Sequence, residues 1–130
     1  MSASQASALD EISFQLAATL DTYDHDVAKM VETWLDMELY RTVSEEIEEI
    51  RRYSAAMPQL SVPWAELLIA HGELVHSLWR LRFQDVDSDR ERLAEVRDRH
   101  TACVHSLKVR CVRMLARPAQ QGSEGSGAFA

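Results

Sequence analysis

The chain contains no asparagine, and glycine and proline are scarce. None of these three residue types occurs in residues 1–57, and only Pro58, Pro63 and Gly72 precede residue 118. A β-rich fold needs a turn about every 8–12 residues, and these residue types make most such turns. Their scarcity argues against a β-rich fold and favours long helices.

Cysteine is also rare, since Cys103 and Cys111 are the only two. Both fall in one expected helix, where eight residues span about 12 Å, whereas a disulfide needs Cα atoms within about 7 Å. Two unpaired thiols are typical of a reducing compartment. Residues 1–7 lack the basic and apolar regions of a secretory signal, and no apolar run approaches the roughly 18 residues of a membrane span. These features predict a cytoplasmic protein outside the membrane.

What the chain does have is apolar residues that recur every three or four positions, which is the period of an amphipathic helix. Four such segments joined by short links predict an all-α antiparallel helical bundle. We expect its helices over about 8–40, 43–56, 62–84 and 88–117. A length of 130 residues fits a single domain over 8–117. The polar ends predict a flexible segment over 1–7 and a disordered tail over 118–130.

The boundary between the first two helices rests on a slip in the apolar period after Met37. Thr42, followed three residues later by Glu45, has the pattern of a capping box and predicts a helix start there. No glycine or proline enforces a break at this boundary. Two alternatives therefore remain: a single kinked helix through residue 56, and a break near Asp21. Trp34, on the apolar face of the first segment, is expected in the core, as is Trp64 in the third.

Two histidines fall on the apolar faces of consecutive helices. His71 lies fifteen residues before Val86, the middle of the link between those helices, and His100 fourteen after it. In an antiparallel hairpin both imidazoles therefore point inward at the same height. One interpretation is a hydrogen-bonded polar pair that fixes helix register, satisfied by each other, by a tyrosine or by carbonyls. The alternative is a zinc or haem site at His71 and His100, with Cys103 one turn beyond.

No catalytic constellation is complete. A di-iron centre needs Glu-x-x-His on two helices, and only Glu73 with His76 has that spacing. No glycine-rich phosphate loop is present, and Cys103 lies on an apolar face rather than in an electropositive one. An enzyme that assembles its site from scattered residues stays open, but the sequence favours a protein without catalytic activity and without a cofactor.

Charge is distributed unevenly along the chain. Residues 1–50 hold twelve acidic and two basic side chains, whereas residues 51–130 hold nine acidic and twelve basic ones. Arg110 and Arg113 belong to a basic stripe on the last helix, which we expect to face the acidic Glu45–Glu49 segment, within one chain or across a dimer. A net charge of −7 and the absence of aromatic residues among these bases argue against nucleic-acid binding.

Trp79 and Phe83 are four residues apart and predict an aromatic pair on a helix surface. If exposed, the pair is a candidate protein contact; otherwise Trp79 covers the core edge against the first helix. The sequence thus predicts a non-enzymatic interaction protein, an adaptor, chaperone-like or structural module. We expect it to self-associate, most simply as a homodimer, through Trp79, Phe83, Arg110 and Arg113. The alternative function is metal or haem binding at the histidine pair.

Overall fold

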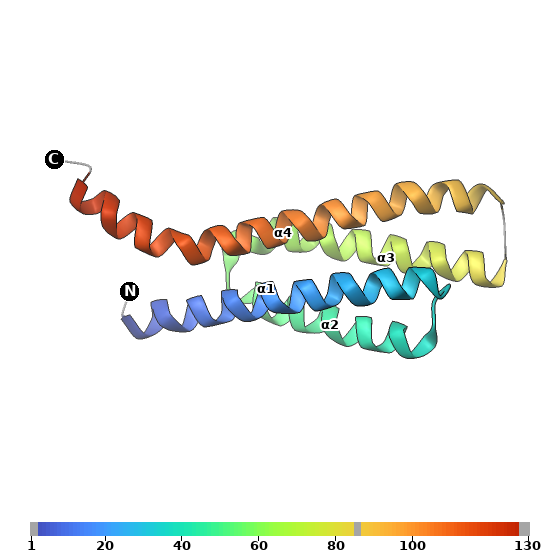
Figure 1. Ribbon diagram of the computed structural model, residues 1–130, viewed down its shortest axis with the longest axis horizontal. Coiled ribbons are helices and arrows are strands. Elements are labelled where there is room, and N and C mark those ends of the chain that lie inside the picture. Colours follow the sequence, from blue (N-terminus) through green and yellow to red (C-terminus); the bar gives the residue numbers. More distant parts are fainter. Residues whose placement is uncertain (1–2, 85–86, 128–130) are drawn as a thin grey trace.

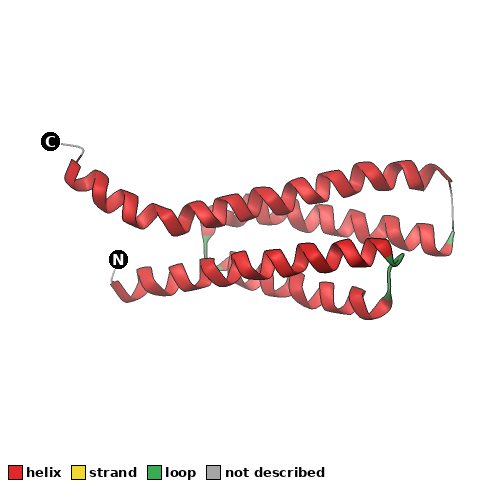
Figure 2. Ribbon diagram, in the orientation of Figure 1, coloured by secondary structure: helices red, strands yellow, loops and turns green. Residues whose placement is uncertain are grey.

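A computed structural model describes residues 3–84 and 87–127, with side chains over 7–84 and 90–115. It contains α1 (Ala3–Glu32), α2 (Met37–Ala55), the short 3₁₀ helix η1 (Pro58–Leu60), α3 (Ser61–Phe83) and α4 (Asp87–Gly127). No strand occurs in this part of the chain (Figure 2). The predicted all-α helical bundle is therefore confirmed.

The four helices run alternately up and down, and each packs beside the one before it (Figure 1). α4 returns to lie beside α1, so α2 and α4 occupy diagonal positions. The bundle consists of two helical hairpins, α1–α2 and α3–α4. Neighbouring helices touch least along the border between α2 and α3.

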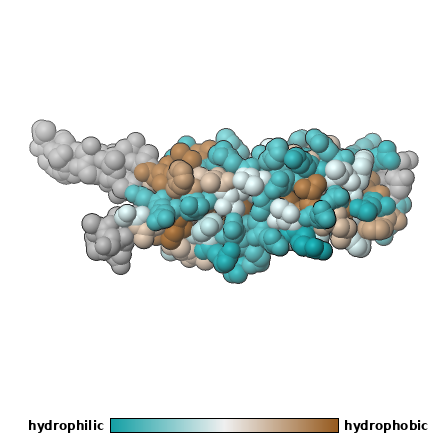
Figure 3. Space-filling view, turned by 60° about the horizontal axis from the view of Figure 1, so that its bottom comes forward, coloured by the Kyte–Doolittle hydropathy of each residue, from teal (hydrophilic) through white to brown (hydrophobic). Residues whose placement is uncertain are grey.

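The core is built from the apolar residues that recur along each helix. Its largest fully buried side chains are Tyr23, Leu16, Leu20, Met30, Leu35, Ile50, Met57, Leu60, Leu67, Leu74, Leu78 and Leu107. Burying a leucine or isoleucine stabilises a fold by about 1.5–3 kcal/mol, so these contacts outweigh any single surface interaction. On the face seen in Figure 3, hydrophilic residues predominate and hydrophobic ones form separate patches. None of the described helices is long and apolar enough to cross a membrane.

The first helix ends at Glu32, so its predicted end near residue 40 is wrong. The backbone N–H of Leu35 donates to the carbonyl of Met30 at 2.9 Å, and that of Trp34 to Val31 at 3.2 Å. This pair of bonds is a Schellman motif, the helix ending that usually has glycine at the position of Trp34. Trp34 and Leu35 instead adopt left-handed backbone angles, with φ of 55° and 69°.

Asp36 begins α2, because its carboxylate accepts the backbone N–H groups of Glu38 and Leu39, both at 3.0 Å. The predicted start at Thr42 is wrong, since that residue lies inside α2. The two alternatives are also wrong. The chain is not one helix through residue 56, and α1 has no break near Asp21 because it runs unbroken past that residue.

The left-handed turn also changes which residues enter the core. It directs Leu35 inward, with 1% of its surface exposed, and leaves Trp34 outside with 45% exposed. The expectation that Trp34 lies in the core is therefore wrong. Trp64 is partly buried and packs against the core, as expected.

α3 differs from its predicted span of 62–84 by one residue at each end. α4 continues past the predicted end at residue 117 to Gly127, since a proline such as Pro118 removes one helical hydrogen bond without always ending a helix. The tail over 118–130 and the flexible segment over 1–7 stay predictions, and residues 1–2 and 128–130 lie outside the described part of the chain.

Candidate functional site

Tyr23 joins the two buried histidines. Its hydroxyl oxygen lies 2.7 Å from Nδ1 of His71 and 2.7 Å from Nε2 of His100. The three rings pack together, with centroids 5.9 Å and 5.6 Å from that of Tyr23. The expectation that both histidines point inward at the same height is confirmed.

Each member of this triad comes from a different helix, Tyr23 from α1, His71 from α3 and His100 from α4. Sliding any one helix along its neighbours would break at least one of the two hydrogen bonds. The triad therefore fixes the relative height of three helices. Apolar contacts alone would specify this height less precisely, because they tolerate small shifts along the helix axis. The sequence analysis allowed a tyrosine as a partner of the histidines but did not identify which one.

One hydroxyl proton serves two histidines, which restricts the tautomers. Tyr23 can donate to only one imidazole and must accept an N–H from the other. Nδ1 of His100 is buried and has no hydrogen-bond partner. Leaving an acceptor unpaired is more common in buried sites than leaving an N–H unpaired. We therefore assign the N–H of His100 to Nε2, with Tyr23 donating to Nδ1 of His71 and Nε2–H of His71 free to donate.

Burial sets the charge state of the triad. It lowers the pKa of His71 to about 4. Burial, helped by the charges of Arg97 and His71, lowers the pKa of His100 to about 3. Burial likewise raises the pKa of the Tyr23 hydroxyl far above its usual range. All three groups are therefore neutral near pH 7.

The metal interpretation gains no support from this geometry. Tyr23 engages one nitrogen of each histidine, and the other nitrogen of His100 is buried. Burial and the charge of Glu66 raise the pKa of the partly buried Cys103 thiol, which disfavours the thiolate that binds metals. In the described part of the chain, no group of three or more histidine, cysteine or acidic residues is placed to hold a metal ion.

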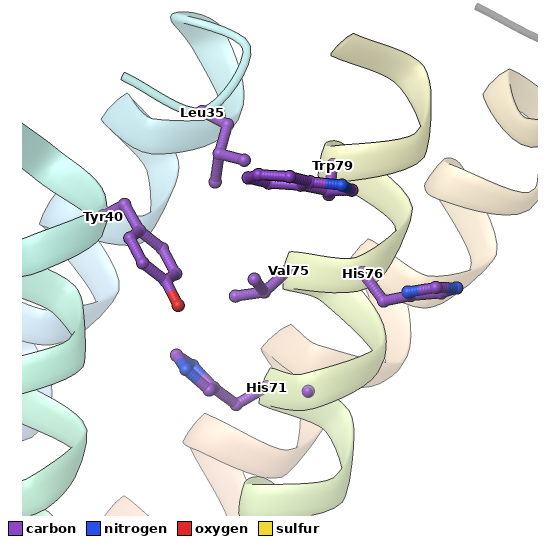
Figure 4. A pocket seen from close by; sticks show the side chains of 7 residues that line it. Leu35, Tyr40, His71, Val75, His76 and Trp79 are labelled. Atoms are coloured by element: carbon purple, nitrogen blue, oxygen red, sulfur yellow. The ribbon is translucent and has the colours of Figure 1, made fainter. Parts of the chain in front are cut away.

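An open pocket of about 420 Å³ lies between α2 and α3, directly over His71. The side chains of Leu35, Tyr40, Val75 and Trp79 converge on it from the two sides, and His71 forms its floor (Figure 4). His76 points away from this group (Figure 4). The pocket is thus mainly apolar, with a tyrosine hydroxyl and a neutral imidazole as its polar groups.

The pocket adjoins a row of uncharged residues along the outward side of α3. Apart from two adjacent pairs, its members are spaced three or four positions apart, and all are exposed except half-buried Val75. We call it the α3 outer row: Val62, Ala65, Leu68, Ile69, Gly72, Val75, His76, Trp79 and Phe83. Ile69 and Phe83 expose 63% and 59% of their surface. A soluble helix normally places charged residues on such a face.

Trp79 and Phe83 form the predicted aromatic pair at one end of this row, with ring centroids 4.5 Å apart. Trp79 exposes 48% of its surface to solvent. Trp79 is thus half-exposed beside Leu35 and Tyr40, which follow the end of α1, and it does not lie against α1 itself.

Arg110 and Arg113 are exposed on α4 and lie beside Leu60, near the link between α2 and α3. Because α2 and α4 are diagonal, these arginines do not face the acidic Glu45–Glu49 segment of their own chain. The intrachain form of that prediction is wrong. The ion pairs of α4 include Arg99 with Glu73 at 2.8 Å, and Lys108 with Asp21.

A further polar contact joins α1 to α2 on the opposite border. Glu46 lies beside Asp26, and its Oε1 atom is buried without a hydrogen-bond partner. Burial, together with a hydrogen bond to Asp26 and the charge of that carboxylate, raises the pKa of Glu46 to about 8. The hydrogen bond between Glu46 and Asp26 therefore exists only while one of the two carboxyl groups keeps its proton.

Comparison with other proteins adds no assignment, because the chain matches no protein-family model, no curated protein and no solved structure.

Proposed function

We propose that this protein is a non-enzymatic interaction module that self-associates through the α3 outer row. The observation that supports the proposal is the length of that row, whose exposed apolar side chains run along the whole of α3 from Val62 to Phe83, with Glu66 and Arg80 along one edge. Exposed apolar surfaces of this extent on a folded domain are typical of protein contacts.

Energetics favour a contact at this place. Each Å² of apolar surface removed from water contributes about 25 cal/mol, and aromatic residues supply the largest areas. Trp79 and Phe83 pack together at one end of the row, where they offer an anchor of the kind that dominates interface energies. The triad is neutral and buried, so it presents no charged acid or base to a substrate, and a scaffold or adaptor role is favoured over catalysis.

The test is molar mass by light scattering across a concentration series. We expect a mass of at least two chains that falls toward one chain in the double variant Ile69→Ser/Phe83→Ser. The matched control is Phe14→Ser/Val112→Ser, which removes comparably exposed apolar residues from α1 and α4. Circular dichroism checks that both variants stay helical. A wild-type protein that remains monomeric at high micromolar concentration, or a control that dissociates equally, would overturn the proposal.

A further inference from the structure

Resting on the proposed function, we infer the geometry of the assembly: two copies pack α3 against α3 in antiparallel orientation, with the two-fold axis at Gly72. The inference combines the position of this glycine, the sizes of the residues around it, the pocket over His71 and the charges at the edge of the row.

Gly72 is the midpoint of α3, with eleven residues before it and eleven after it in Ser61–Phe83. It is exposed, and a Cβ atom built on it would meet nothing within 4 Å. Its missing side chain therefore relieves no crowding inside the chain, although glycine within a helix is destabilising. A glycine does allow a second helix to approach the backbone closely.

An antiparallel contact centred on Gly72 brings together residues that lie equally far from it along the helix. Ala65 and Trp79 are each seven residues away, so the smallest side chain of the row faces the largest. Ile69 and Val75 are each three residues away and place apolar side chains on either side of the axis. A parallel contact would instead set Trp79 against its own copy and Ala65 against its own copy, which fills space poorly.

The same geometry supplies an occupant for the pocket over His71. Leu68 precedes Gly72 by one helical turn and lies on the side of the row that borders α2. A two-fold axis keeps this side next to the same side of the other copy, where Val75 and Trp79 line the pocket. Leu68 of the partner subunit therefore enters the pocket between Tyr40 and Trp79.

Charges along the opposite edge of the row are complementary in this arrangement. Glu66 lies six residues before Gly72, and Arg80 lies eight residues after it on the same edge. The antiparallel contact brings each glutamate near the arginine of the other copy, whereas a parallel contact sets like charges together. Glu73, which is next to the axis, forms an ion pair with Arg99 of its own chain.

Cysteine cross-linking in the intact chain tests the geometry, in a Cys103→Ala background because Cys103 is partly accessible. Gly72→Cys places two thiols at the axis, where they can form a disulfide under mild oxidation. Ala65→Cys is the matched variant on the same face. In the antiparallel arrangement its two thiols are separated by fourteen residues of helix, about 21 Å, and cannot join. We expect a cross-linked dimer from Gly72→Cys and none from Ala65→Cys.

A second variant keeps the inference testable if cysteine at the axis disturbs the contact. Gly72 is exposed and a Cβ built on it meets nothing within 4 Å, so Gly72→Leu should fold normally and weaken self-association by about tenfold or more. Cross-linking of Ala65→Cys would indicate a parallel contact and overturn the inference. So would a dimer of unchanged affinity in Gly72→Leu, because the copies would then meet elsewhere. A monomeric wild type would instead refute the proposed function itself.

Discussion

The hydroxyl of Tyr23 lies 2.7 Å from Nε2 of His100, although 77 positions separate the two residues in the chain. With the equal contact to His71, this bond ties together the first, third and last helices at one height. A hydrogen bond in a core contributes little to the net free energy of unfolding, but removing one partner lowers that free energy because the other partner is left buried and unpaired. The triad therefore sets the register of these helices. Removing one of its members should lower the stability of the fold more than removing all three together.

Tyr23→Phe should destabilise the fold by about 1–3 kcal/mol, because it leaves both histidines without a partner in the core. The triple variant Tyr23→Phe/His71→Leu/His100→Leu should recover most of this loss, since no polar atom of the triad remains. Urea denaturation monitored by circular dichroism measures both. Equal stability of Tyr23→Phe and the wild type would contradict the hydrogen-bonded arrangement.

Thermal stability should reach its maximum near pH 6.5. The pKa values of His71 and His100 are lowered from 6.5 to about 4 and about 3, so the stability they contribute is present above pH 6.5 and is lost as pH falls through these values. The pKa of Glu46 is raised to about 8, so its contribution is present at low pH and is lost as pH rises toward 8. Between pH 4.5 and 6.5 the free energy of unfolding should rise with pH, because the gain from two histidines is larger than the loss from one carboxyl group.

Substituting Glu46→Gln separates the two effects, because glutamine stays neutral at every pH. The melting temperature of this variant should no longer fall between pH 6.5 and pH 8, while the loss on the acid side persists. Glu45→Gln, on the exposed side of the same helix, serves as control and should behave as the wild type. An alkaline decrease that survives in Glu46→Gln would show that another group causes it.

Gly72→Ala should stabilise the monomer by about 1 kcal/mol, because alanine is the better helix former and the site has open space. The measurement is chemical denaturation at submicromolar concentration, where association contributes little. Ala65→Gly, on the same face of α3, should show the opposite sign. A destabilised Gly72→Ala would mean that the glycine is required within a single chain.

Trp34→Gly should be more stable than Trp34→Ala by about 1 kcal/mol, because glycine adopts the left-handed angle of this turn without strain. Both variants lose the same exposed indole ring and its contact with Arg90, so the comparison isolates the backbone. Inside an ordinary helix glycine would be the less stable of the two. That ordering at position 34 would refute the Schellman turn.

The helical period predicted the bundle because burial of apolar residues dominates its stability, and the four apolar faces pack as the spacing indicates. The histidine pair was predictable for a similar reason: in an antiparallel hairpin, equal distance from the link means equal height. The α1–α2 turn was not, since Trp34 and Leu35 take left-handed angles usually signalled by glycine or asparagine. Their positions follow from the core site that Leu35 fills, which only the tertiary structure defines.

The role of Tyr23 and the position of the basic stripe depend on which helices are neighbours. Periodicity identifies the buried face of each helix but not the order of the helices around the bundle. Two chain segments of opposite charge, such as Glu45–Glu49 and the one with Arg110 and Arg113, can therefore be predicted to meet and still be diagonal.

An even number of antiparallel helices brings the first turn of α1 and the last turns of α4 to the same end of the bundle (Figure 1). A two-fold contact at the middle of α3 turns the second copy end over end, so these termini point to opposite poles of the dimer. Any group joined to them would be displayed twice, in opposite directions. Such a dimer would act as a bivalent spacer, able to connect two ligands too far apart for one copy to reach.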